Sequence, residues 1–326
     1  MTIVESPEAL ARATTGPLAL SIGNFDGFHR GHRVVVAELL SRARGLGATP
    51  VVTTFEPHPL GVVHPGRVPR LLTTTEEKVE LLAAAGVEIV FLVPFDGRIA
   101  SMPATRFLGW LGVRRGWHFV LGDDFRMGHD RRCDIEVLDG LGRTMGFALD
   151  AVPAVVYESA RISSSRIRES LSAGRLTEAN AMLGAPYRLG GTVVSGEGRG
   201  RRLGVATANL SVAAEKLLPA DGVYAALAEL AEPRPAALYV GDRPTYPGSG
   251  RSVEVHLLDA DLDLKGGTLG VRVLERIRAD RAFPTESDLG KEIRKDLEAI
   301  RRRVEEGRTR SGGGALFRFD KVGGLC

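Results

Sequence analysis

The feature that most constrains the fold of this chain lies at residues 18–40, where an apolar segment, a glycine-rich turn and a helix-like segment follow one another. The apolar segment at 18–22 reads LALSI and predicts a buried strand. The turn at 23–27 contains two glycines, and apolar side chains recur with helical spacing over 34–40. Where such a turn opens a helix, backbone N–H groups and the helix dipole both favour an anion. The stretch therefore predicts a phosphate site for a nucleotide.

Two histidines, His29 and His32, lie at the start of the expected helix with Gly31 between them. Their imidazole N–H groups can donate to phosphate oxygens and stabilise the charge that develops during transfer at phosphorus. The plainer interpretation is a pair of unrelated surface histidines beside a turn. A zinc site would need a third ligand, which the neighbouring sequence lacks. A Walker A loop is excluded because no GKS or GKT follows the turn.

The length of 326 residues indicates about two domains. The formal net charge of +3 is mild and no basic block with interleaved aromatics occurs, so we expect no nucleic-acid partner. No apolar run approaches the roughly 20 residues of a membrane span and no secretory signal is recognised, so we expect no membrane contact. The two cysteines, Cys133 and Cys326, have no CxxC or metal-ligand spacing, which favours a reducing cytoplasm.

Short apolar strands alternate with helices through the first half of the chain, which predicts an α/β fold with a doubly wound parallel sheet. Ligands bind beyond the carboxyl ends of the strands in such sheets. Besides 18–22, the expected strands are 48–55, 87–93, 117–121 and 148–156. The expected wall of the site is therefore made of the turns at 23–32, 55–59 and 122–128.

Three serines run directly into a helix-like segment at 163–168, and two arginines lie in its first turn. Hydroxyl and guanidinium groups donate hydrogen bonds to anions, and a helix N-terminus adds a favourable dipole. This motif therefore predicts a second phosphate contact.

From about Tyr187 the sequence changes to short alternating strands with little helix, which predicts a small antiparallel β-barrel. Its expected strands are 190–194, 222–231, 236–241, 252–259 and 269–274. A charged helix at 285–306 closes the unit, and the tail at 307–326 is expected to be disordered. The expected domains are therefore residues 1–186 and residues 187–306, followed by the tail.

The turn at 23–32 (GNFDGFHRGH) resembles the GNFDGxHxGH signature of prokaryotic bifunctional riboflavin kinase/FAD synthetases. The segment at 163–168 resembles the SSTxIR motif of that family, with Ser165 in place of Thr. Further similarities follow in the same order along the chain, over about residues 16–305. They are TFEPHP at 54–59, GDDF at 122–125, GVATANL at 204–210, RPTY at 243–246 and VEVHLLD at 253–259.

The resemblance implies a nucleotidyltransferase domain of the HxGH type, followed by a riboflavin kinase barrel with a C-terminal helix. The barrel module would phosphorylate riboflavin with ATP and Mg²⁺ to give FMN. The first module would transfer AMP from a second ATP to FMN, giving FAD and pyrophosphate. The implied partners are these small molecules, and we expect a monomer or a weak homo-oligomer.

The same resemblance assigns catalytic and metal-binding roles. His29 and His32 would hold the ATP phosphates, and Glu254 would act as general base for the ribityl hydroxyl. Thr207 and Asn209 would supply hard oxygen ligands for Mg²⁺. The plainer interpretation of Glu254 is a strand residue that faces solvent.

The resemblance also assigns substrate-binding residues. The ATP-binding set is Gly23, Asn24, Phe25, Asp26, Gly31, Ser163, Ser164, Ser165, Arg168, Gly196 and Gly204. The flavin-binding set is His58, Pro59, Arg70 and Asp124. For Arg70 a solvated loop arginine is the alternative.

Four positions depart from the family pattern in the second module. Val205 replaces an aromatic residue and Ala206 a proline, while Ala260 and Lys265 stand where Phe and Tyr are common. Losing a proline from an ordered loop costs about 0.4–1 kcal/mol of conformational entropy, and losing aromatics removes packing or stacking surface. One alternative is therefore an FAD synthetase whose kinase module has decayed or accepts an altered flavin. A second alternative is a flavin-binding or sensing protein without turnover.

Overall fold

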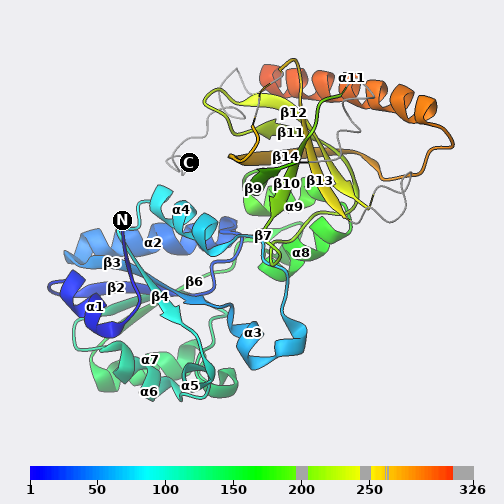
Figure 1. Ribbon diagram of the computed structural model, residues 1–326. Coiled ribbons are helices and arrows are strands. Elements are labelled where there is room, and N and C mark those ends of the chain that lie inside the picture. The colour runs from blue at the N-terminus through cyan, green and yellow to red at the C-terminus, as the bar shows by residue number, and fades with distance from the viewer. Residues whose placement is uncertain (196–204, 243–250, 261, 263, 311–326) are drawn as a thin grey trace. The chain divides into compact units, whose positions relative to one another are not determined.

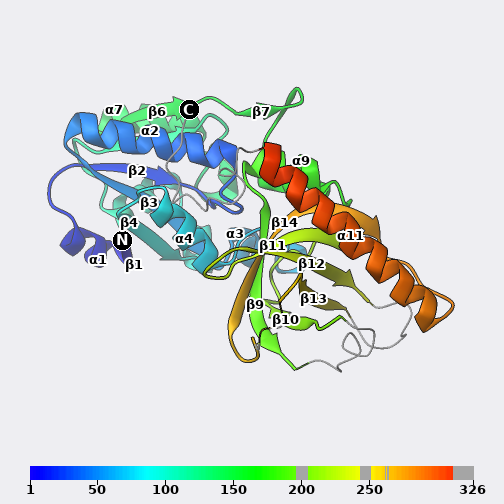
Figure 2. The ribbon, with the colours of Figure 1, turned by 90° about the horizontal axis from the view of Figure 1, so that it is seen from above.

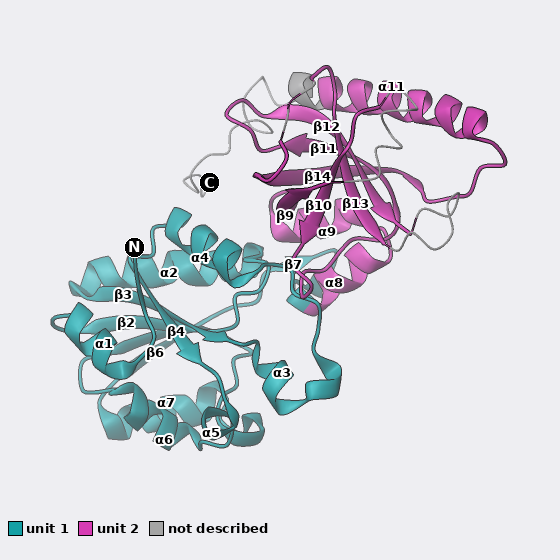
Figure 3. Cartoon of the chain, in the orientation of Figure 1, with its two compact units in different colours: residues 1–164, 320–326 teal, residues 165–319 magenta. Residues whose placement is uncertain are grey.

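The computed structural model describes residues 1–195, 205–242, 251–260, 262 and 264–310 (Figure 1). The described part of the chain divides into two compact units, one within residues 1–164 and the other within residues 165–310 (Figure 3). In the described part of the chain, no helix combines the length and the apolarity that are needed to cross a bilayer. Each unit has its own sheet and its own hydrophobic core.

The first unit is built on a six-stranded sheet in the order β1-β4-β3-β2-β5-β6, and every pairing in it is parallel. This confirms the expected doubly wound parallel sheet, with β1 as an additional edge strand. The strands are β1 (Thr2–Val4), β2 (Leu18–Ile22), β3 (Thr49–Glu56), β4 (Ile89–Pro94), β5 (His118–Gly122) and β6 (Ala148–Val152). The strand order reverses between β2 and β5, so ligands are expected beyond the carboxyl ends of these two strands.

Helices cover both faces of this sheet (Figure 1). Successive residues of β2 alternate between two cores, because Leu18 and Leu20 pack in one cluster and Ala19 in the other. One face carries α2 (Arg30–Leu46) and α4 (Thr75–Ala84). The opposite face carries α1 (Pro7–Ala13), α6 (Ala104–Leu111) and α7 (Ile135–Met145). Burial on both faces explains why the central strands are largely apolar and do not alternate between apolar and polar residues.

Smaller elements connect the layers of the first unit. After β3 come α3 (Pro59–Val63) and a 3₁₀ turn at Pro65–Arg67, and after β4 comes α5 (Gly97–Ala100). A second 3₁₀ turn at His129–Arg131 precedes α7, and a two-stranded hairpin of β7 (Val156–Tyr157) and β8 (Ala160–Arg161) follows β6.

The second unit is a closed barrel of six strands, and all its pairings are antiparallel. Closure removes the exposed edges that an open antiparallel sheet would leave. The strands are β9 (Tyr187–Val194), β10 (Ala208–Val212), β11 (Gly222–Ala228), β12 (Arg234–Gly241), β13 (Ser252–Leu257) and β14 (Thr268–Ala279). The barrel predicted from the alternating pattern is therefore confirmed.

The C-terminal helix α11 (Glu286–Arg310) runs along the outside of the barrel, across β11 and β12 (Figure 2). Its Ile300 and Val304 are buried against a small cluster that includes Val223 and Leu227. The helix extends to Arg310, past the expected end at 306, and the rest of the expected tail lies outside the described residues.

Two short helices, α8 (Ser164–Ser172) and α9 (Leu176–Leu183), precede the barrel and belong largely to its unit. Nδ2 of Asn180 in α9 donates to the carbonyls of Val273 (3.0 Å) and Leu274 (3.3 Å), and its Oδ1 accepts from the Tyr187 amide (2.8 Å). These bonds attach α9 to β14 and β9. The boundary between the two compact units, after Ser164, therefore lies earlier in the chain than the domain boundary expected at 186. That expected boundary stays a prediction about the sequence domains.

We expect the substitution Asn180→Ala to destabilise the barrel unit by about 1–3 kcal/mol, because it leaves buried backbone groups without their partner. Hydrogen exchange of the β9 and β14 amides under increasing urea measures this change. Both tryptophans, Trp110 and Trp117, lie in the first unit, so the unfolding transition followed by tryptophan fluorescence should stay in place. Unchanged exchange protection in β9 and β14 would contradict the prediction.

Candidate functional site

The turn after β2 lies where the strand order of the first sheet reverses. Phe25 and Phe28 have φ of 50° and 37°, a left-handed backbone that bulky residues rarely adopt. Both rings are buried in the core beneath α2, and this packing holds the strained turn. The side chain of Phe25, expected at the ATP site, thus lies in the core, where it also contacts the His32 ring with centroids 5.2 Å apart.

His29 and His32 stack against each other at the N-terminus of α2, with ring centroids 3.6 Å apart and planes at 15°. His29 is the N-cap residue, and its Nδ1 accepts from the His32 amide at 3.3 Å. A Cβ on Gly31 would lie 3.1 Å from Cε1 of His29, so glycine leaves room for the capping ring. The spacing of the motif therefore produces two imidazoles side by side at a positive helix end.

His32 is a neutral imidazole in the folded protein. Burial places its pKa well below the usual 6.5, and the nearby charges of His29 and Lys78 lower the pKa further. Its Nδ1 is buried and has no hydrogen-bond partner in the described part of the chain. A buried polar atom without a partner at a helix N-terminus is suited to a hydrogen bond with a ligand.

Asp26 ties the turn to a distant loop. Its buried carboxylate accepts from the amides of Leu72 and Thr73, each at 2.9 Å, and from the Thr73 hydroxyl at 3.2 Å. The Thr73 hydroxyl oxygen in turn accepts from the Gly27 amide at 3.0 Å. These contacts give Asp26 a structural role in the turn. The expectation that it also binds ATP stays a prediction.

The serine motif at 163–168 contacts the same turn through Ser164. The Ser164 hydroxyl donates to the carbonyl of Asp26 at 2.9 Å, across 138 residues of sequence. Ser163 precedes it in the first unit, whereas Ser165 and Arg168 continue into α8 in the second unit. The placement of Ser165 and Arg168 relative to the histidines stays a prediction.

A small polar pocket lies beside the turn. It brings together Asn24, expected at the ATP side, and His58, expected at the flavin side. His58 caps α3, since its Nδ1 accepts from the Leu60 amide at 3.2 Å, and Pro59 is the first residue of that helix. The other lining residues are Asp26, Phe55, Glu56, Leu71, Thr73, Thr75 and Lys78.

The two remaining flavin-side residues lie on exposed loops. Arg70 is exposed and is not among the residues that line the pocket. Asp124 follows β5 and forms an ion pair with Arg161 at 2.6 Å, and Arg161 also contacts Asp123. The hairpin that carries Arg161 therefore holds the loop after β5 by charge pairing.

Lys78 is a residue of this pocket that the sequence patterns did not single out. Its Nζ donates to Oγ1 of Thr54 at 3.1 Å and to the carbonyl of Phe55 at 3.4 Å. Burial lowers its pKa, and the carboxylates of Glu56 and Asp26 partly offset that effect. The spacing from Lys78 to the buried Leu82 places both on the inner face of α4, and this spacing was the available sequence signal.

The barrel unit brings three predicted residues together on β10, β13 and the loop before β10. The Thr207 hydroxyl donates to Oε2 of Glu254 at 3.2 Å, and Asn209 lies opposite Glu254 in the strand register. Ser252 donates to the other carboxylate oxygen at 3.3 Å. A carboxylate, a hydroxyl and an amide on neighbouring backbone segments can hold a hard cation and accept a proton.

The loop that lacks the family proline is held by another contact. Nδ1 of His256 donates to the carbonyl of Ala206 at 2.7 Å, and Val205 before it is buried. This bond restrains the backbone just before Thr207. Ala260 is half-buried and Lys265 is exposed. Gly196, Gly204 and the RPTY segment at 243–246 lie outside the described residues.

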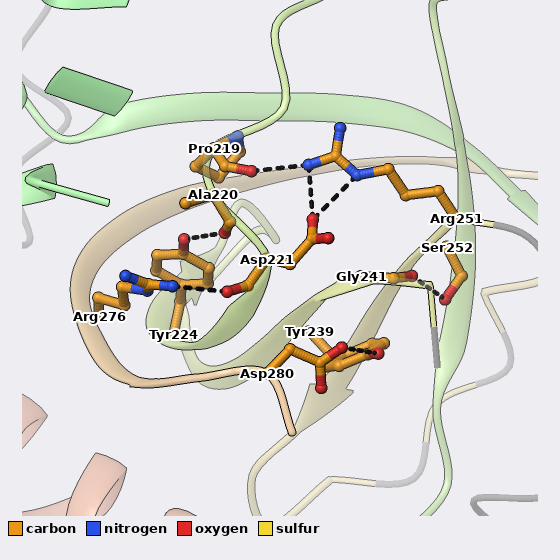
Figure 4. A network of polar contacts seen from close by, with 10 residues as sticks. All are labelled: Pro219, Ala220, Asp221, Tyr224, Tyr239, Gly241, Arg251, Ser252, Arg276 and Asp280. Atoms are coloured by element: carbon orange, nitrogen blue, oxygen red, sulfur yellow. Dashed lines mark hydrogen bonds and ion pairs between the residues drawn. The ribbon is translucent and has the colours of Figure 1, made fainter. Parts of the chain in front are cut away.

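A polar network anchors the start of β13 at one end of the barrel (Figure 4). Arg251 donates to Oδ1 of Asp221 at 2.7 Å and to the carbonyl of Pro219 at 2.9 Å. Arg276 donates to the carbonyl of Asp221 at 2.7 Å. Nearby, burial raises the pKa of Tyr224 to about 12, so its hydroxyl stays protonated and donates to the Ala220 carbonyl. This network fixes the strand that carries Glu254.

Two family models match this chain, one in each half, in the order that the sequence motifs predict. The model of FAD synthetase matches residues 11–166, and the model of riboflavin kinase matches residues 183–304. The chain is 35% identical over 300 residues to the bifunctional riboflavin kinase/FMN adenylyltransferase of Escherichia coli strain K12, covering 91% of this chain and 96% of that protein. The corresponding protein of Bacillus subtilis strain 168 is 32% identical over 309 residues, with the same coverage of both chains.

A solved structure shares the fold over almost the whole chain. It is named a macrolide-efflux protein from Streptococcus pneumoniae, and it aligns with a TM-score of 0.82 and 30% sequence identity. The alignment covers 92% of this chain and 98% of that chain.

The neutral state of His32 predicts that the stability of the first unit depends on pH. Below the usual pKa of 6.5 the unfolded chain binds a proton at His32 that the folded chain does not, so stability falls as the pH falls. The expected slope is at most about 1.4 kcal/mol per pH unit for this one proton. Urea unfolding followed by tryptophan fluorescence between pH 7 and pH 5 should show a smaller loss for His32→Gln. Replacement of the exposed His64 by Gln should keep the wild-type slope, and equal slopes for all three proteins would contradict the prediction.

Proposed function

This chain belongs to the family of bifunctional riboflavin kinases/FMN adenylyltransferases, and from this premise we propose which unit and which residues carry each of its two activities. The enzyme phosphorylates riboflavin to FMN, and it transfers AMP from ATP to FMN to give FAD and pyrophosphate. We assign adenylyl transfer to the first compact unit and riboflavin phosphorylation to the barrel unit. The stacked pair of His29 and His32 at the N-terminus of α2, beside the reversal in strand order, carries this proposal.

Adenylyl transfer needs positioning and charge stabilisation rather than a covalent enzyme intermediate. A phosphate oxygen of FMN forms a bond to the α-phosphorus of ATP, while the bond from that phosphorus to the bridging oxygen breaks and pyrophosphate leaves. We assign the two imidazoles and the amides at the start of α2 to the ATP phosphates. His32 can stabilise the developing negative charge by donating a hydrogen bond to it.

Riboflavin phosphorylation transfers the γ-phosphoryl group of ATP to the terminal ribityl hydroxyl. We assign Glu254 as the base that accepts the hydroxyl proton as the new oxygen–phosphorus bond forms and ADP leaves. The Thr207 and Ser252 hydroxyls donate to its carboxylate and orient it. Because the β13 strand is anchored at its start, this carboxylate has a defined position.

The residues around Glu254 fit a magnesium ion. Mg²⁺ prefers oxygen ligands and is usually held by one or two protein groups together with substrate phosphates. Thr207 and Asn209 supply such oxygens beside the carboxylate. Bound there, the ion would neutralise phosphate charge during transfer. Within the described residues no group of three or more His, Cys, Asp or Glu side chains could hold a metal, so the proposed site depends on hydroxyl and amide oxygens.

A kinase module that is inactive or accepts an altered flavin is the alternative, because of the residues at 205, 206, 260 and 265. The bond from His256 to the Ala206 carbonyl favours an ordered loop in spite of the missing proline. We further propose that the enzyme works in a reducing cytoplasm, in keeping with its buried free Cys133, and that it is a monomer or a weak homo-oligomer.

One assay with two starting substrates tests the proposal. Incubation with riboflavin, ATP and Mg²⁺ should yield FMN and then FAD, and incubation with FMN and ATP should yield FAD with release of pyrophosphate. Chromatography of the flavins measures both products. FAD from FMN without FMN from riboflavin would favour the alternative of an inactive kinase module, and tight FMN binding without any pyrophosphate would indicate a flavin-binding protein.

The substitution His29→Ala should lower FAD formation about 100- to 1,000-fold, the usual effect of removing one donor to a developing charge. Riboflavin phosphorylation by the same preparation should stay nearly unchanged, because Glu254 and its neighbours lie in the barrel. Initial rates with FMN and with riboflavin measure the two effects. Loss of both activities together would mean that the proposed division of labour is wrong.

The substitution Asn209→Ala should have the reverse effect. We expect FMN formation from riboflavin to fall about 10- to 100-fold, as when a metal site loses a supporting group. FAD formation from supplied FMN should not change. Ser211→Ala, at an exposed position two residues along β10, is the matched control and should retain both rates. A higher magnesium concentration should partly restore the rate of the Asn209 variant.

A further inference from the structure

Lys78 is an unusual residue of the first unit because its charged group is buried. Only 7% of the residue is exposed, and it projects from α4 into the wall of the polar pocket. Removing an ammonium group from water costs several kcal/mol unless hydrogen bonds and opposite charges offset the loss. The partners of Lys78 therefore identify what this buried charge stabilises.

One set of partners connects Lys78 to the glycine turn. Its Nζ donates to Oγ1 of Thr54 at 3.1 Å, and the Thr54 hydroxyl donates to the carbonyl of Asn24 at 3.2 Å. Thr54 is fully buried, so water does not compete for these bonds. A chain of two hydrogen bonds therefore runs from α4 into the turn that precedes His29. Consecutive bonds of this kind strengthen each other in a low-dielectric interior.

The other partner is on the flavin-side loop. Nζ of Lys78 donates to the carbonyl of Phe55 at 3.4 Å, near the end of β3 and just before the Glu56–Pro59 segment. Glu56 and Asp26 line the same pocket and place two carboxylates near the ammonium group. One lysine thus contacts the supports of both loops that border the pocket.

The pocket between these loops is too small for a complete substrate. Its cavity volume of about 10 Å³ is about the space that one water molecule needs, far less than a complete small ligand occupies. The pocket therefore marks where the glycine turn and the flavin-side loop come together, and each substrate would be held mainly outside it, by its own loop. Transfer between them depends on their alignment, and a displacement of about 1 Å can cost about 100-fold in rate.

We propose that Lys78 is a positioning residue for adenylyl transfer, which holds the glycine turn through Thr54 and the flavin-side loop through the Phe55 carbonyl so that FMN meets the α-phosphorus of ATP in line. This inference rests on the proposed roles of these two loops in binding ATP and FMN. Lys78 acts through the loops and not by contact with substrate. Its loss therefore affects the turnover step more than the binding of either substrate.

The test compares Lys78→Met and Thr54→Val in the full-length enzyme. Lys78→Met should lower kcat for FAD formation about 100-fold, with much smaller changes in KM for ATP and FMN. Thr54→Val removes one link and should lower kcat about tenfold, the rate equivalent of one hydrogen bond. In the double variant the loss should be smaller than the product of the two single losses, because both changes act on one network.

Two controls separate this role from general damage. Thr53→Val makes the same substitution at the preceding buried position, where the hydroxyl has no hydrogen-bond partner among the described residues, and it should retain the wild-type rate. Urea unfolding of each variant followed by tryptophan fluorescence reports whether the first unit, which holds both tryptophans, is folded. If Lys78→Met fails to fold, the kcat of Thr54→Val against Thr53→Val still decides the question.

Three results would overturn the inference. An unchanged kcat in Lys78→Met and Thr54→Val would show that the links do not position the loops. A raised KM for FMN or ATP at constant kcat would show that Lys78 binds a substrate directly. Losses that multiply fully in the double variant would show that Lys78 acts independently of Thr54. If the wild-type enzyme itself made no FAD from FMN and ATP, the proposed function would fail instead.

Discussion

The burial of β2 on both faces is the constraint on which the nucleotide site depends. All five of its residues are buried, including its one polar residue, Ser21, so the strand presents no side chain to a ligand. Polar groups that can contact a ligand therefore lie beyond its carboxyl end, where the strand order reverses. The buried rings of Phe25 and Phe28 hold that turn in a strained backbone, and the Asp26 carboxylate ties it to the loop at Leu72 and Thr73.

The barrel positions its polar groups in a different way, through strand pairing. Closing six antiparallel strands places Asn209 opposite Glu254, while the loop before β10 brings Thr207 within 3.2 Å of the same carboxylate. A strand register is set by pairing along its whole length, so a shift by one residue would move these side chains to the opposite face. The anchoring of β13 at Arg251 therefore protects the geometry of the proposed kinase site.

Much of the fold could be predicted because it depends on local patterns. The apolar run at 18–22, the glycine turn and the helical spacing after His29 each agree with the element observed. The helix α4 likewise begins at a local pattern, since Thr74 and Glu77 form a capping box with both reciprocal hydrogen bonds. The attachment of α9 to the barrel could not be predicted, since it depends on Asn180 meeting carbonyls 93 and 94 residues away.

In the candidate site, too, some features follow from local sequence and others depend on tertiary contacts. By itself the sequence determined that two imidazoles lie together at the helix start. His29, Gly31 and His32 lie within one helical turn, so their spacing alone brings them close to each other. Only the tertiary structure decided which polar side chains are buried away from solvent. It buried His32 and thereby kept it neutral, and it turned Lys78, which looks like an ordinary surface lysine in the sequence, into a buried link between two loops. Burial results from contacts between distant segments, and a local pattern such as the spacing of Lys78 and Leu82 does not specify those contacts.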